Sequence, residues 1–143
     1  MLKGISPLLS PALLSMLCRM GHGYELVLAD AHFPGETFNK RVLRADGVKI
    51  ALLLDAILPL FELDDYVPDP LAMMAAVPGD SHDAQLLKAY RAVIERHVPN
   101  APATVFVERF AFYERAKAAF AVVMTGETAK YGNIILKKGV TPV

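Results

Sequence analysis

The chain has 143 residues, of which 54% are hydrophobic, and its 15 Lys and Arg residues balance 15 Asp and Glu residues. This length suits one substantial core, so we expect a single domain over residues 1–143. A net charge of zero without basic clusters argues against nucleic acid as a partner. The high apolar content predicts elements buried on both faces, or apolar surface hidden between subunits.

The N-terminal segment loosely resembles a signal peptide, but Pro7, Pro11 and Arg19 interrupt it and no small-residue cleavage site follows. No run of about 18 uninterrupted apolar residues occurs elsewhere, so we expect no membrane span. Cys18 is the only cysteine, which excludes a disulfide within the chain and suits a reducing compartment. We therefore expect a cytoplasmic protein in which Cys18 packs as a buried, inert thiol.

Helical and strand patterns alternate along the chain, with Ser10 and Pro11 as the cap and first residue of the first helix. Helices are predicted over residues 11–20, 46–58, 81–97 and 110–118. Strands are predicted over residues 24–29, 41–44, 71–77, 104–107, 120–125 and 133–136, with a loop at 30–37. This alternation indicates an α/β layered fold.

The first candidate cluster surrounds the strand that begins near Tyr24. His22 lies between two glycines just before this strand, and Asp30 and His32 follow it. A neutral histidine titrates close to physiological pH, so His22 can both donate and accept a proton. The alternatives are that His22 fills a turn, that His32 packs a loop, and that Asp30 bonds nearby backbone amides.

Two further clusters lie near the C-terminus. Arg109 follows a predicted strand end, where α/β sheets place ligands, and its guanidinium can bind but not exchange protons at neutral pH. The aromatic residues that follow it, 110–113, are interpreted as core. Tyr131 and Asn133 offer a hydroxyl and an amide, and Gly132 permits close backbone approach; a plain turn into the last strand is the alternative.

No glycine-rich phosphate loop and no dinucleotide fingerprint are present, so we expect no cofactor. One rival hypothesis is a metal-dependent hydrolase or isomerase that uses His22, Asp30 and His32 as ligands. A second is a non-catalytic monosaccharide-binding or transport-accessory protein, whose site would look the same.

Taken together, these clusters resemble the RbsD/FucU family of sugar mutarotases, and within it the L-fucose branch. The resemblance covers nearly the whole chain. The matching strings are Met20–Gly23, Asp30–Pro34, Arg44–Gly47, Pro59–Leu63, Arg109–Arg115 and Tyr131–Ile134. Each string is weak alone, but six strings in order with matching spacing are specific.

The resemblance implies roles for particular residues. The histidine of the Gly-His-Gly string is the family's catalytic proton donor and corresponds to His22. Tyr131 is expected to donate a hydrogen bond near the reacting centre, which makes it the second catalytic candidate. The expected substrate-binding residues are Asp30, His32, Arg109, Tyr131, Gly132 and Asn133, with no metal ligand.

The same resemblance implies a single-domain, three-layer α/β/α sandwich that assembles into a ring-based homodecamer with sites at subunit interfaces. The implied activity is interconversion of the α and β anomers of L-fucose, or of a related monosaccharide, by ring opening and reclosure. The ribose branch is expected to carry a histidine at the position of Arg109, so Arg109 favours L-fucose over a ribose-type pyranase. Tyr131, His32 or a water takes the anomeric proton.

Overall fold

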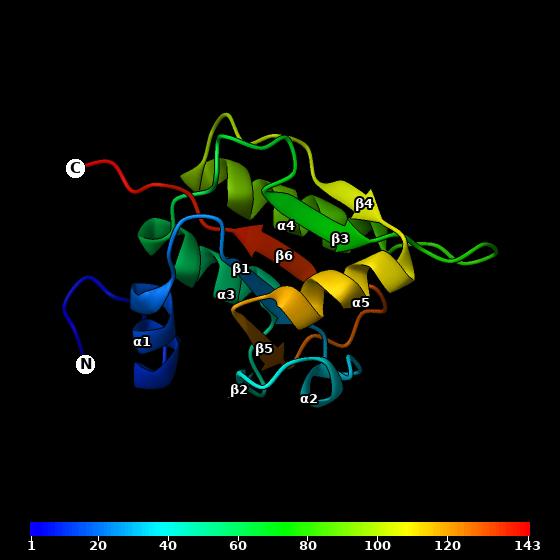
Figure 1. Cartoon of the computed structure of the whole chain (residues 1–143), viewed down its shortest axis with the longest axis horizontal. Helices are drawn as coiled ribbons and strands as arrows, with labels where there is room; N and C mark the ends of the chain where they lie inside the picture. The colour runs from blue at the N-terminus through cyan, green and yellow to red at the C-terminus, as the bar shows by residue number, and fades with distance from the viewer.

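A six-stranded mixed sheet forms the middle layer of the molecule (Figure 1). The computed structural model describes all 143 residues. The strands are β1 (Glu25–Ala29), β2 (Val42–Ala45), β3 (Leu71–Met74), β4 (Val105–Val107), β5 (Ala121–Thr125) and β6 (Ile134–Lys137). Their spatial order is β2-β5-β1-β6-β3-β4. Strand β6 runs antiparallel to both neighbours, and the other pairs are parallel.

Helices cover both faces of this sheet (Figure 1). They are α1 (Pro11–Arg19), α2 (Gly35–Phe38), α3 (Ile50–Ile57), α4 (Ala84–His97) and α5 (Arg109–Ala118), with a 3-10 turn, η1, at Leu58–Leu60. Helices α1, α3 and α4 pack on one face, and α2 and α5 pack on the other. The predicted α/β/α sandwich is therefore confirmed. None of these helices is long and apolar enough to cross a membrane.

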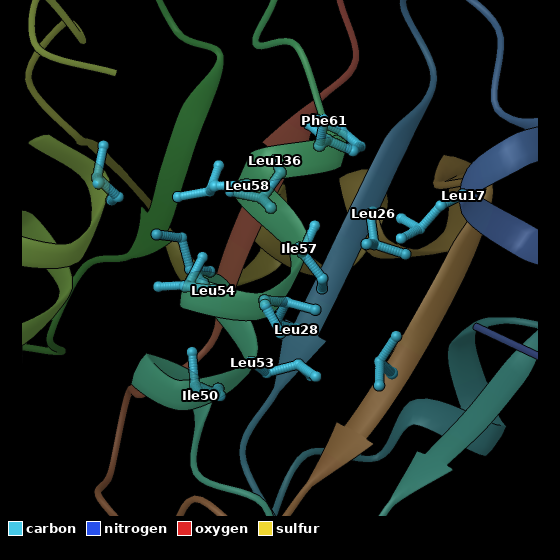
Figure 2. Close-up of a cluster of buried hydrophobic side chains, with 14 of the residues drawn as sticks. Leu17, Leu26, Leu28, Ile50, Leu53, Leu54, Ile57, Leu58, Phe61 and Leu136 are labelled. Carbon is cyan, nitrogen blue, oxygen red and sulfur yellow. The ribbon is translucent and has the colours of Figure 1, made fainter. Parts of the chain in front are cut away.

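Strand β1 is buried on both faces. Leu26 and Leu28 point into the larger core, where they pack with the leucines and isoleucines of α3 (Figure 2). Val27 and Ala29 point into the smaller core beneath α5. All four side chains are fully buried. A strand covered on both sides reads as a continuous apolar run, which explains why residues 24–29 lack polar alternation.

Most predicted elements are present, with shifted boundaries. The loop predicted over residues 30–37 contains most of the short helix α2, a single turn that begins at Gly35. The helix predicted from Ser81 begins later, because the carboxylate of Asp83 caps the first N–H groups of α4. The helix predicted over residues 46–58 starts at Ile50, after a turn at Gly47 with φ of 82°.

The prediction that Cys18 is buried is wrong, because its thiol is exposed. The cap of α1 is as predicted, since Ser10 Oγ accepts the N–H of Leu13 at 3.1 Å. Helix α1 buries the stripe that contains Leu13 and Leu17. Cys18 lies about 100° around the helix from Leu17, on the solvent side.

Replacing a leucine of α3 tests the larger core. Leu54 is fully buried, so we expect Leu54→Ala to lower the free energy of unfolding by about 2–5 kcal/mol. Leu2→Ala removes the same atoms from an exposed position and should change it by less than about 0.5 kcal/mol. Urea unfolding of both variants at equal protein concentration measures the difference, and equal losses would contradict this packing.

Candidate active site

A cavity of about 490 Å³ opens at the edge of the sheet where β1 and β3 end and β6 begins. This is the carboxyl edge of the parallel strands, where open α/β sheets place their ligands. Its lining is made of Asp30, His32, Phe33, Pro34, Met74, Val77, Arg109, Tyr113, Lys130, Tyr131 and Asn133. Five of the predicted site residues therefore share one cavity: Asp30, His32, Arg109, Tyr131 and Asn133.

Asp30 joins the end of β1 to the start of β6. Its backbone N–H donates to Oδ1 of Asn133 at 2.7 Å, and its own Oδ1 accepts the N–H of His32 at 3.0 Å. Burial raises the pKa of Asp30, although the His32 N–H and imidazole oppose the rise. Because the Asn133 oxygen is occupied, its NH₂ group is the part that a ligand can use.

His32 and Arg109 reach the cavity from different parts of the chain, His32 from the loop after β1 and Arg109 from the start of α5. Nε2 of His32 lies 3.3 Å from the carbonyl oxygen of Thr128, which ties the imidazole to the loop before β6. Arg109 is the first residue of α5, and its guanidinium carbon lies 4.7 Å from the ring centroid of Phe110. This exposed guanidinium keeps its N–H donors available to a ligand at the cavity.

The backbone of the loop before β6 is held in an unusual conformation. Tyr131 has φ of 58°, in the left-handed region that non-glycine residues rarely adopt. The next residue, Gly132, lies behind the cavity, and its carbonyl accepts the buried hydroxyl of Tyr90 at 2.7 Å. A Cβ on Gly132 would lie 3.0 Å from Cγ of Glu127. Gly132 therefore serves the site through its backbone.

The structure does not bring His22 into this cavity. His22 precedes β1, whereas Asp30 follows it, and the five residues of β1 span roughly 16 Å at the usual rise per residue. At this opposite edge, Nε2 of His22 lies 3.4 Å from Oδ2 of the buried Asp64. The ring of Tyr66 lies 5.4 Å from the imidazole. Within one protomer the predicted site is split between the two edges of the sheet.

The same separation bears on the metal hypothesis. His22 cannot share an ion with Asp30 and His32 of its own protomer, because β1 lies between them. No group of three His, Cys, Asp or Glu side chains is close enough to hold a metal ion. The proposed three-ligand set is therefore not assembled in the protomer.

We call the cavity and the surface around His22 the two half-sites. Sequence reasoning missed one residue of each. Asp64, the carboxylate beside His22, has no sequence signal, because it is far from His22 in the chain. The sequence predicts Tyr113 in the core, but it is half-buried and lines the cavity, and its ring stacks on that of Phe38 with the ring centroids 4.6 Å apart. Its spacing of four residues from Arg109 on one helix face could have placed it there.

The cavity combines a carboxylate, an amide, a guanidinium and a phenol with apolar walls. Such a set can accept and donate several directed hydrogen bonds, which suits a small polyhydroxylated ligand. The apolar lining, which includes Met74 and Val77, can contact the carbon face of the same ligand.

Asp30→Asn tests the cost of burying this carboxylate. Since the pKa of Asp30 is raised in the fold, the protonated form is favoured, and stability falls as pH rises through the folded value. The asparagine keeps the oxygen that accepts from His32 but carries no charge. We expect the variant to gain stability relative to wild type as pH rises above about 4, the ordinary pKa of an aspartate, measured by urea unfolding.

Asp46→Asn is the matched control. Arg44 bonds this exposed carboxylate at 2.8 Å and holds the pKa of Asp46 below its usual range. Wild type should therefore gain stability relative to this variant as pH rises, by a small amount because the pair is exposed. A pH trend of the same sign in both variants would contradict the assignment for Asp30.

Comparisons with known proteins agree over the full chain. Residues 3–141 match the RbsD / FucU transport protein family. The L-fucose mutarotase of Glaesserella parasuis is 63% identical over 143 residues, which is 100% of this chain and 98% of that protein. The L-fucose mutarotase of Histophilus somni is 59% identical over 100% of this chain and 99% of its own length.

Solved structures give the same result. The crystal structure of the fucose mutarotase from Streptococcus pneumoniae in complex with L-fucose has a TM-score of 0.93 and 46% identity, covering 99% of this chain and 100% of that one. The RbsD of Bacillus subtilis, complexed with D-ribose, has a TM-score of 0.73 at 22% identity and shares the fold. The family match and the identity extend from one end of the chain to the other, so the chain belongs to the RbsD / FucU family.

Proposed function

We propose that this protein is an isomerase, an L-fucose mutarotase that interconverts the α and β anomers of the sugar. The observation that carries this proposal is full-length similarity to proteins of that activity, including one whose structure contains L-fucose. The cavity at the carboxyl edge of the sheet is the substrate site. Its volume of about 490 Å³ lies within the usual range for small-molecule sites.

The lining residues have separate tasks in this proposal. Asp30 accepts hydrogen bonds from sugar hydroxyls, and Arg109 and the NH₂ group of Asn133 donate to sugar oxygens. Tyr131 and His32 face the reacting end. Asp30 is well suited because its backbone N–H is bonded to the Asn133 side chain and its carboxylate accepts the N–H of His32, so little ordering is needed when the sugar binds.

The reaction moves two protons. On ring opening, His22 donates a proton to the ring oxygen while the anomeric hydroxyl loses one, and the C1–O5 bond breaks to give the aldehyde. Rotation about the C1–C2 bond and the reverse transfers close the ring as the other anomer, with His22 now the base. His32 or a water takes the anomeric proton, because the phenol of Tyr131 already carries its own proton and donates it to Asp80. Neither a redox step nor a group transfer occurs, so the proposal includes no cofactor.

His22 must reach this cavity from a second copy of the chain. Half of its side chain is exposed, and the buried carboxylate of Asp64 holds it at the surface. Exposed aromatic side chains lie near both half-sites: Tyr66 beside His22, and Phe110 beside Arg109. Aromatic side chains are enriched in the buried centres of protein–protein interfaces. We therefore place the complete site between two protomers.

The two half-sites lie on different surfaces, so their contact is head-to-tail. Head-to-tail contacts close into rings when the rotation permits it. This supports the predicted ring-based homodecamer, in which each interface holds one site. We also predict that the protein is cytoplasmic.

His22→Asn tests the catalytic assignment. Loss of general acid catalysis should slow exchange between the anomers of L-fucose by about 10²–10⁴-fold, measured by saturation-difference NMR. His97→Asn is the control. This histidine is the last residue of α4, its Nε2 lies 2.7 Å from Oδ1 of Asp55 on α3, and it belongs to neither half-site. Unchanged exchange in His22→Asn would remove His22 from the mechanism.

Mixing two inactive variants tests the shared site. His22→Ala lacks the acid, and Asp30→Asn lacks the carboxylate. If each site takes His22 from one protomer and Asp30 from its neighbour, an equal mixture assembled together should restore about one quarter of the sites. If both residues came from one protomer, no site would be restored. Exchange rates of the co-expressed variants, with each variant alone as control, separate these outcomes.

The alternative function is a binder of monosaccharides, in line with the word transport in the family description. A binder would hold L-fucose without changing the exchange rate. A panel that includes D-ribose distinguishes L-fucose specificity from a ribose-type pyranase activity.

A further inference from the structure

The phenol of Tyr131 donates its one hydrogen bond to a carboxylate that lies outside the cavity. Tyr131 lines the cavity, and its hydroxyl donates to Oδ2 of Asp80 at 2.9 Å. Asp80 belongs to the segment between β3 and α4 and is not part of the cavity wall. It therefore acts on any bound ligand only through its neighbours.

The Asp80 carboxylate can only accept. Oδ1 accepts the N–H of Ser81 at 2.9 Å, and Nζ of Lys130 lies 3.3 Å from both oxygens. The Ser81 amide, the Tyr131 phenol and the Lys130 ammonium together hold the pKa of Asp80 below its usual range. At neutral pH the carboxylate is ionised and has no proton to offer, so the shared proton belongs to the phenol.

The ring of Tyr131 is held by the same segment. The His82 ring lies 5.5 Å from it, and Nε2 of His82 is bonded to the carbonyl oxygen of Met74 at 2.8 Å, at the end of β3. The backbone of Tyr131 is itself confined to φ of 58°. The ring position and the O–H direction of Tyr131 are therefore both fixed. A ligand in the cavity can then interact with the phenol oxygen only by donating a hydrogen bond to its free lone pair.

We propose that Asp80 is a positioning residue that makes Tyr131 a hydrogen-bond acceptor, to which one hydroxyl of the bound sugar donates. This inference rests on the proposed function. It replaces the sequence-based expectation that Tyr131 donates near the reacting centre. A site arranged in this way selects a ligand with a hydroxyl at that position, because a group that only accepts leaves the phenol oxygen unpaired.

A double-mutant cycle tests the route through Tyr131. Asp80→Ala should slow L-fucose anomer exchange about tenfold, and Tyr131→Phe at least as much. The double variant should match Tyr131→Phe, because Asp80 has no target once the phenol is gone. Asp80→Asn, whose amide oxygen still accepts the phenol proton, should stay within about twofold of wild type. Multiplied losses in the double variant, or no loss in Asp80→Ala, would overturn the proposal.

Asp83→Asn is the matched control in the same segment. Asp83 caps α4 and does not line the cavity, and asparagine caps equally well. Thermal unfolding of every variant shows whether it is folded. If Asp80→Ala does not fold, Asp80→Leu replaces it. Its effect on anomer exchange is then measured in wild type and in Tyr131→Phe, as in the cycle above.

The direction of the hydrogen bond has its own test. In monodeoxyfluoro analogues of L-fucose, fluorine can accept but cannot donate. We expect one analogue to bind wild type at least tenfold more weakly than L-fucose, and this penalty to disappear in Tyr131→Phe. Equal penalties in both proteins at every position would overturn the acceptor role. Wild type that binds L-fucose without exchanging its anomers would contradict the proposed function, while these affinities would still decide the role of Asp80.

Discussion

The fold depends on a central strand that is buried on both faces. Leu26 and Leu28 pack into one core and Val27 into the other, with no exposed surface. A polar side chain along β1 would lose its hydration without a partner, so polar chemistry is confined to the two ends of the strand. Asp30 lies at one end and His22 at the other. The separation of these two groups is therefore a direct consequence of how the sheet is covered.

At the cavity end, side chains secure backbone groups more than they secure one another. Thr125 Oγ donates to the carbonyl of Ala29 at 2.7 Å, Asn133 receives the N–H of Asp30, and Tyr90 holds the carbonyl of Gly132. These bonds join β5, β1, α4 and the segment before β6 around one cavity wall. Such support reduces the reorganisation that a sugar would require on binding.

The proposed contact between the two half-sites would bury aromatic side chains that are exposed in the single protomer. Tyr66 and Phe110 have 74% and 60% of their surface exposed in the protomer. One lies beside the imidazole and the other beside the guanidinium of Arg109. A head-to-tail contact would bury them and deliver His22 to the cavity in one step, so assembly and catalysis would depend on the same surface.

The sequence by itself determined the alternating elements, the continuous apolar strands and the polar residues at strand ends, because these depend on local patterns of side chains. It predicted Asp30 and Arg109 just after strands, and the carboxyl ends of parallel strands share one edge of the sheet. Asn133 precedes its strand and reaches the same edge only because β6 is antiparallel to its neighbours, which the structure decided. Only the tertiary structure decided the pairing of His22 with Asp64 and of Tyr131 with Asp80. Those pairs join segments that are distant in the chain, and their contact depends on strand order and loop path, which no local pattern encodes.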